Sequence, residues 1–134
     1  MKLASYIADG KEAFGVVTGD GVVTMNERLG GRYASLRGAL AADALTAMKN
    51  ATQGAKPDHR LADVKFLPPI PNPEKILCAG INYRSHAAET GRDLPKQPSM
   101  FIRLANTLTG HDGELIRPLV SQSFDFEGEL AVVI

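Results

Sequence analysis

The chain has 134 residues with 15 basic and 15 acidic side chains, so its formal net charge is zero, and 44% of its residues are hydrophobic. This is a globular composition, and the balanced charge argues against nucleic-acid binding by phosphate neutralisation and against an electrostatic membrane anchor. The single cysteine, Cys78, excludes an internal disulfide, and no segment approaches the roughly 18 apolar residues of a membrane span. Because no signal-peptide pattern begins the chain, we expect a cytoplasmic protein.

Short β-prone segments alternate with turn residues at the start of the chain. The segments 3–8, 13–18 and 22–25 are separated by Asp9-Gly10 and by Gly19-Asp20-Gly21. Asp-Gly pairs between such segments favour hairpin turns, because glycine accepts a positive φ and aspartate tolerates it. The pattern predicts a small antiparallel meander.

A different period follows the meander. Four apolar residues recur at intervals of four, namely Leu36, Leu40, Ala44 and Met48. This spacing predicts one amphipathic helix, capped by Ser35 and ending near Gly54.

Prolines mark a boundary in the middle of the chain. Four of the eight prolines lie within residues 68–73, where their fixed φ and missing N–H groups exclude both a helix and a central strand. We therefore predict an α+β domain at residues 1–67, a proline-rich linker at 68–73, and a second domain from residue 74 to 134.

The second domain begins with an apolar strand at residues 75–79. A short helix follows, capped by Asn82, running through His86 to Glu89 and ending at Gly91. Further strands are expected at 99–104 and at 124–134. The last ends in the apolar run 130–134, which is typical of a strand buried on both faces.

Three carboxylates lie on one face of the last predicted strand. The β period of two brings Asp125, Glu127 and Glu129 to the same side, where their oxygens are able to converge on one cation. Carboxylate oxygens suit Mg²⁺, Mn²⁺ or Ca²⁺ better than zinc. A solvated strand face explains the same alternation, and an arginine is the alternative partner for carboxylates entering a buried strand.

Two further features suggest chemistry. His86 and Glu89 are three residues apart, so one helix face carries both, and a carboxylate beside an imidazole suits a general base. A surface pair is the simpler explanation of this spacing. Arg103, near the end of the 99–104 strand, is a candidate for binding an anionic substrate, with simple surface exposure as its alternative.

Three ordered motifs together carry a resemblance to a known family. Residues 75–89, residues 98–101 and residues 125–134 look like the corresponding segments of the fumarylacetoacetate hydrolase family. The resemblance covers about residues 68–134, and the first 67 residues are similar to the less distinctive N-terminal domain of many members.

The resemblance implies a fold that is α+β and mainly β, in which the N-terminal meander and helix precede a mixed β-roll. It implies a divalent cation, Mg²⁺ or alternatively Mn²⁺ or Ca²⁺, held by Glu127 and Glu129, with His86 and Glu89 as a water-activating pair. Tyr83 and Arg103 are the expected substrate-binding residues. Arg103 stands where the family commonly has a lysine, and arginine cannot donate a proton at neutral pH.

The implied activity is hydrolysis of a C–C bond in a 2,4-dioxo acid, usually by a homodimer. The alternatives are a lyase, decarboxylase or isomerase of the same scaffold acting on a 2-oxo acid, and a catalytically inactive fragment or interaction module. The partner expected in either enzyme is a small dicarbonyl or 2-oxo acid, with no nucleic acid and no membrane. Because the family's third acidic ligand follows the Glu-x-Glu strand, the β-roll is expected to be truncated here.

Overall fold

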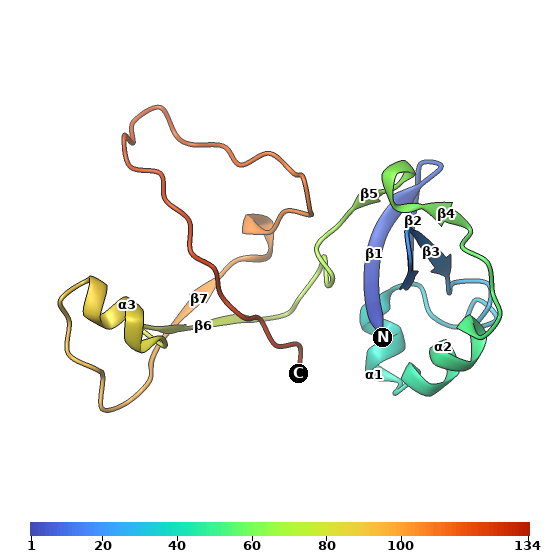
Figure 1. Cartoon of the computed structure of the whole chain (residues 1–134), viewed down its shortest axis with the longest axis horizontal. Coiled ribbons are helices and arrows are strands. Elements are labelled where there is room, and N and C mark those ends of the chain that lie inside the picture. The colour runs from blue at the N-terminus through green and yellow to red at the C-terminus, as the bar shows by residue number, and fades with distance from the viewer.

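The computed structural model describes residues 1–134 and contains two antiparallel sheets that lie apart from each other (Figure 1). The first sheet has the strand order β4-β3-β2-β1-β5, and the second pairs β6 with β7. The elements are β1 (Lys2–Ala8), β2 (Lys11–Thr18), β3 (Gly21–Thr24), α1 (Leu36–Ala41), α2 (Leu45–Thr52), β4 (His59–Arg60), η1 (Leu61–Asp63), β5 (Lys65–Phe66), β6 (Ile76–Gly80), α3 (Arg84–Glu89), β7 (Ser99–Arg103) and η2 (Ala105–Thr107). The predicted α+β class is confirmed, whereas the β-roll stays a prediction.

The predicted meander is present as β1, β2 and β3. Asp9 and Gly10 have φ angles of 50° and 74°, and they join strands that pair directly at Ala8 and Lys11. Positive φ at both central residues is what a two-residue type I′ hairpin requires. The next turn uses Gly19, with a φ of 59°, between the paired residues Thr18 and Gly21.

The first sheet buries side chains on both of its faces. One face joins the helices α1 and α2 in a cluster of nine buried residues. The members of this cluster are Phe14, Val16, Val23, Met25, Leu29, Leu36, Ala39, Ala44 and Met48. The other face buries a smaller cluster made of Ala4, Tyr6, Ala8 and Val22. This alternation is the period of two expected of a strand covered on each side.

The single helix predicted after Ser35 is wrong, because the chain forms two helices. Ser35 does cap α1, accepting a hydrogen bond from the Gly38 amide at 3.2 Å. Asp43 then adopts a φ of 51°, and the Ala44 amide bonds back to the Ala39 carbonyl at 2.9 Å. A left-handed residue of this kind ends a helix, so α2 starts afresh at Leu45. The predicted end near Gly54 is confirmed, since α2 stops at Thr52.

The proline-rich segment at residues 68–73 contains neither helix nor strand, as predicted. It is tied to the first sheet, because the Ser5 hydroxyl donates to the Pro69 carbonyl at 2.7 Å. Arg37 of α1 donates to the Asn72 carbonyl at 3.0 Å and pairs with Glu74. The division of the chain into domains at this segment stays a prediction.

Two of the three strands predicted on the C-terminal side of the linker, those at 75–79 and 99–104, are confirmed as β6 and β7. They pair from Ile76 with Arg103 to Gly80 with Ser99. All five residues of β7 are exposed. The longest helix in the protein, α2, has eight residues, and no helix is long and apolar enough to cross a membrane.

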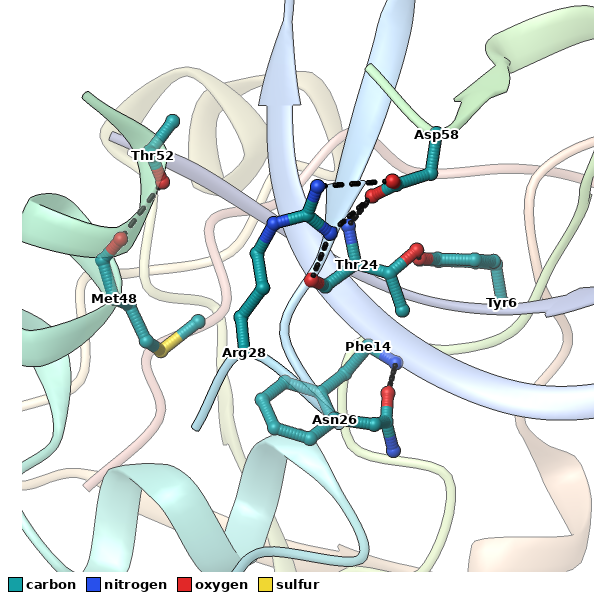
Figure 2. Close-up of polar contacts among 8 residues, drawn as sticks. All are labelled: Tyr6, Phe14, Thr24, Asn26, Arg28, Met48, Thr52 and Asp58. Carbon is teal, nitrogen blue, oxygen red and sulfur yellow. Dashed lines mark hydrogen bonds and ion pairs between the residues drawn. The ribbon is translucent and has the colours of Figure 1, made fainter. Parts of the chain in front are cut away.

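A polar network fastens the segment before β4 to the end of β3 (Figure 2). Arg28 donates to the Asp58 carboxylate from both terminal guanidinium nitrogens, Nη1 at 2.6 Å and Nη2 at 2.9 Å, and the Thr24 amide donates to the same carboxylate at 2.7 Å. Burial acts to raise the pKa of Asp58, but these hydrogen bonds outweigh it, and the pKa lies below its ordinary value. The Tyr6 hydroxyl hydrogen-bonds to Thr24 at 2.8 Å, and burial raises the pKa of that tyrosine.

Ionised Asp58 is therefore expected to stabilise the fold. Because its folded pKa lies below the unfolded value, the stabilisation is complete at neutral pH and is lost as the pH falls through the depressed pKa. Asp58→Asn should lower the free energy of unfolding at pH 7 by about 1 kcal/mol, since the Arg28 pair is partly exposed. The difference from the unmodified chain should shrink below about pH 4 in urea titrations.

Asp63→Asn is the matched control for this measurement. The Asp63 carboxylate faces Arg60 at 3.7 Å, and both side chains are more than half exposed. Its loss should change stability by less than about 0.5 kcal/mol. An Asp58→Asn variant with the same stability and the same pH profile as the unmodified chain would contradict the role of the network.

Candidate active site

The helix α3 carries the candidate general base. It follows β6 through Ile81, whose φ of 53° lies in the left-handed region and turns the chain sharply. The predicted cap at Asn82 is wrong, because Tyr83 occupies the cap position in an extended conformation and its side chain makes no capping bond. The end predicted at Gly91 is confirmed, since α3 stops at Glu89 and Gly91 has a φ of 63°.

His86 lies between two carboxylates. Its Nδ1 is 3.8 Å from Glu89 Oε2, one helical turn away, and its Nε2 is 3.5 Å from Glu127 Oε1. The imidazole is 39% exposed, so solvent or a small molecule is able to reach it. Both distances exceed that of a hydrogen bond, although catalytic contacts are often long in a ligand-free protein and tighten when substrate binds.

The strand predicted at residues 124–134 is wrong. This segment, called here the acidic segment, has no regular secondary structure. Its apolar end is exposed instead of buried on both faces, with Leu130 89% and Val132 81% exposed. The physical reason is the lack of a paired neighbour, because a strand exists only where its N–H and C=O groups meet those of another strand.

The three carboxylates nevertheless border one hollow. Asp125, Glu127 and Glu129 line an open hollow of about 450 Å³ together with Phe126 and Arg103, the last residue of β7. Arg103 thus brings a positive charge to a hollow with three acidic side chains. A guanidinium in such a place suits a planar carboxylate of a ligand.

Tyr83 touches the acidic segment. Its hydroxyl oxygen accepts a hydrogen bond from the Leu130 amide at 3.1 Å. The structure thus brings Tyr83 and His86 of one motif against Leu130 and Glu127 of another, across more than forty residues of chain.

The donor chemistry of the hollow fits a hard divalent cation, because carboxylate oxygens are the ligands that Mg²⁺, Mn²⁺ and Ca²⁺ prefer. The arrangement is incomplete, however, since no three His, Cys, Asp or Glu side chains converge closely enough to hold a metal ion. The roles of Glu127 and Glu129 as ligands, and of His86 and Glu89 as a water-activating pair, stay predictions.

One feature of the site was missed from the sequence. The contact between His86 and Glu127 joins the predicted general base to a predicted metal ligand, and local spacing carries no signal for it. Asp125 was predicted to lie with Glu127 and Glu129, and it lines the hollow beside them.

Residues 75–134 match the family model described as fumarylacetoacetate (FAA) hydrolase, C-terminal. The human protein "Oxaloacetate tautomerase FAHD2A, mitochondrial" is 41% identical over 73 residues, which cover 54% of this chain and 23% of that protein. "Oxaloacetate tautomerase YisK" of Bacillus subtilis is 46% identical over 81 residues, 57% of this chain and 27% of that protein.

A solved structure is also similar. The crystal structure of a Mycobacterium smegmatis protein provisionally designated HpcE superposes with a TM-score of 0.64 and 26% identity, covering 86% of this chain and 40% of that one. The chain spans about a quarter of the length of the curated relatives that it matches, between 23% and 29% for those named here and an archaeal relative from Archaeoglobus fulgidus.

Proposed function

The chain belongs, through its residues 75–134, to the fumarylacetoacetate hydrolase family, and we propose that it is part of an enzyme that tautomerises a 2-oxo dicarboxylic acid of the oxaloacetate type. The oxaloacetate tautomerases among the relatives support this choice of reaction. The observation that carries it is the position of His86 Nε2, 3.5 Å from Glu127, a carboxylate of the hollow.

His86 would be the general base. Its Nε2 would remove a proton from C3 of the 2-oxo acid, the C–H electron pair would form the C2=C3 bond, and the C2=O π pair would move onto oxygen, which takes up the proton that His86 releases to give the enol. The reverse sequence restores the keto form, so atoms and electrons balance without a co-reactant. Glu89 lies beside Nδ1 at 3.8 Å, where it would orient the imidazole and stabilise its protonated form.

Glu127 and Glu129 would hold a divalent cation, Mg²⁺ in the first instance. When bound, the cation would supply Lewis-acid chemistry toward the carbonyl oxygen of the 2-oxo acid. Glu127 would then be adjacent to both the cation and the base. A 2-oxo acid bound to that cation would then bring the carbon next to its carbonyl toward His86.

Arg103 would bind a carboxylate of the substrate. It lines the same hollow as the three acidic side chains, and its guanidinium is always charged. A 2-oxo dicarboxylic acid has one carboxylate beside the carbonyl and a second at the far end, so a cation site and a guanidinium suit its two ends.

Hydrolysis of a C–C bond in a 2,4-dioxo acid is the second candidate. The pairing of His86 with Glu89 favours it, because the same base is suited to removing a proton from water. The two reactions differ in the proton that His86 takes, so product analysis separates them. A homodimer and a cytoplasmic location remain part of the proposal, although the human relative named above is mitochondrial.

Replacement of the base should abolish most of the activity. His86→Ala is expected to lower kcat for oxaloacetate enolisation by about 10²- to 10⁴-fold, the usual contribution of a general base. The measurement follows the ultraviolet absorbance of the enol of oxaloacetate, with the whole protein as the catalyst. His111→Ala removes an imidazole that is 75% exposed and pairs with Asp112, and this control should keep full activity. A His86→Ala enzyme within a few-fold of the unmodified one would refute the assignment.

The acidic side chains should determine cation affinity. Glu127→Gln and Glu129→Gln are each expected to weaken Mn²⁺ or Mg²⁺ binding by about tenfold or more in calorimetry, because each removes a charged oxygen ligand. Glu114→Gln is the matched control, since Glu114 is exposed and does not line the hollow. Equal affinities in all three variants would show that the cation binds elsewhere or does not bind.

The charge of Arg103 should lower the KM for the substrate. Arg103→Gln is expected to raise KM for oxaloacetate by about tenfold or more, since a charged hydrogen bond to the substrate is lost. Arg103→Lys should recover part of the loss, because the charge returns without the planar fork. Arg92→Gln, at an exposed residue outside the hollow, should leave KM unchanged. If Arg103→Gln behaves as Arg92→Gln does, the substrate carboxylate binds elsewhere.

A further inference from the structure

The acidic segment is held near α3 by side chains rather than by a sheet. Residues 124–134 have no strand partner, and their apolar side chains are largely exposed. Two polar contacts connect this segment to the rest of the chain, one between Glu127 and His86 and the other between Leu130 and Tyr83.

The two contacts run side by side. Tyr83 is the cap residue of α3, and His86 follows it by three residues, so the two side chains are neighbours along one side of the helix. Glu127 and Leu130 are likewise three residues apart. The segment therefore meets α3 at two points in the opposite order, with Tyr83 against Leu130 and His86 against Glu127, so it runs antiparallel to the helix where the two meet.

The two contacts differ in strength. The Leu130 amide donates to the Tyr83 hydroxyl oxygen at 3.1 Å, within the range of a hydrogen bond. The separation of His86 and Glu127, 3.5 Å, is longer, and both side chains are partly solvated. The tyrosine contact also involves the backbone, so it fixes the chain itself and not one flexible side chain.

We propose that Tyr83 is a positioning residue, whose hydroxyl holds the backbone of the acidic segment so that Glu127 stays beside His86. This inference rests on the proposed function, and it replaces the substrate-binding role expected from the sequence. The hydroxyl acts through Leu130 and Glu127 and does not need to touch the reacting atoms. Its loss should slow the chemical step more than it weakens substrate binding, because a small displacement of a reacting group is costly.

Tyr83→Phe tests the proposal, since it removes the hydroxyl and keeps the ring. In the substrate-free protein, the amide resonance of Leu130 and the imidazole resonances of His86 should both shift in heteronuclear NMR spectra. With oxaloacetate, kcat should fall by about tenfold while KM stays within about twofold. Tyr33→Phe is the matched control, because the Tyr33 ring lies under Arg32 at 5.7 Å and belongs to the first sheet's side of the protein.

Leu130→Pro removes the donor instead of the acceptor, since proline has no N–H. It should reproduce the loss in kcat, and the double variant should be no worse than either single variant, as expected for two partners of one bond. Val132→Pro, at a similarly exposed residue two positions on, controls for the effect of proline on the chain.

The outcomes separate this proposal from the proposed function. Unshifted Leu130 and His86 resonances in Tyr83→Phe would overturn the positioning role, and so would a raised KM with an unchanged kcat, which indicates contact with substrate. If the unmodified protein does not enolise oxaloacetate, the proposed function fails. The NMR comparison of Tyr83→Phe with Tyr33→Phe still decides the role of Tyr83 in that case, because it is made without substrate.

Discussion

The contact between His86 and Glu127 is the interaction on which the candidate site depends. It joins α3 to the acidic segment across forty-one positions of sequence, at 3.5 Å. Glu89 reaches the other ring nitrogen through helix geometry alone, since it lies one turn away on the same element. Glu127 reaches the imidazole only through tertiary structure. Without this contact, α3 would carry only an exposed pair of His86 and Glu89. The carboxylates would then border a hollow with no base beside it.

The sequence predicted those elements whose stabilising interactions are local. The β1–β2 hairpin follows from Asp9 and Gly10, because their positive φ angles are intrinsic to the turn. The Ser35 cap likewise acts within its own helix. The break at Asp43 was not predicted, because the apolar spacing of four continues across it and neither glycine nor proline marks it. Only the left-handed φ of Asp43 reveals it.

The acidic segment illustrates the limit of periodicity. A period of two describes which side chains share a face of a strand; Asp125, Glu127 and Glu129 do border one hollow, but Phe126 between them borders it as well. The same period says nothing about the neighbouring strand that supplies hydrogen bonds to the backbone. The apolar run from Leu130 therefore predicted burial that the structure does not have. Tyr83 was singled out for the site, but its contact with the Leu130 backbone is visible only in three dimensions.

The geometry also bears on which reaction the site would favour. Tautomerisation and C–C hydrolysis of such substrates both generate negative charge on the oxygen of a 2-oxo group, so both would benefit from the cation proposed at Glu127 and Glu129. They differ in the atom that gives its proton to the base. If Glu127 binds the cation, a base 3.5 Å from Glu127 lies close to the chelated end of the substrate. Tautomerisation would require His86 to reach only the carbon bonded to the 2-oxo group, whereas hydrolysis would also require a water placed against a carbonyl two bonds away. The proximity of the base to Glu127 is therefore the reason that tautomerisation is proposed ahead of hydrolytic cleavage.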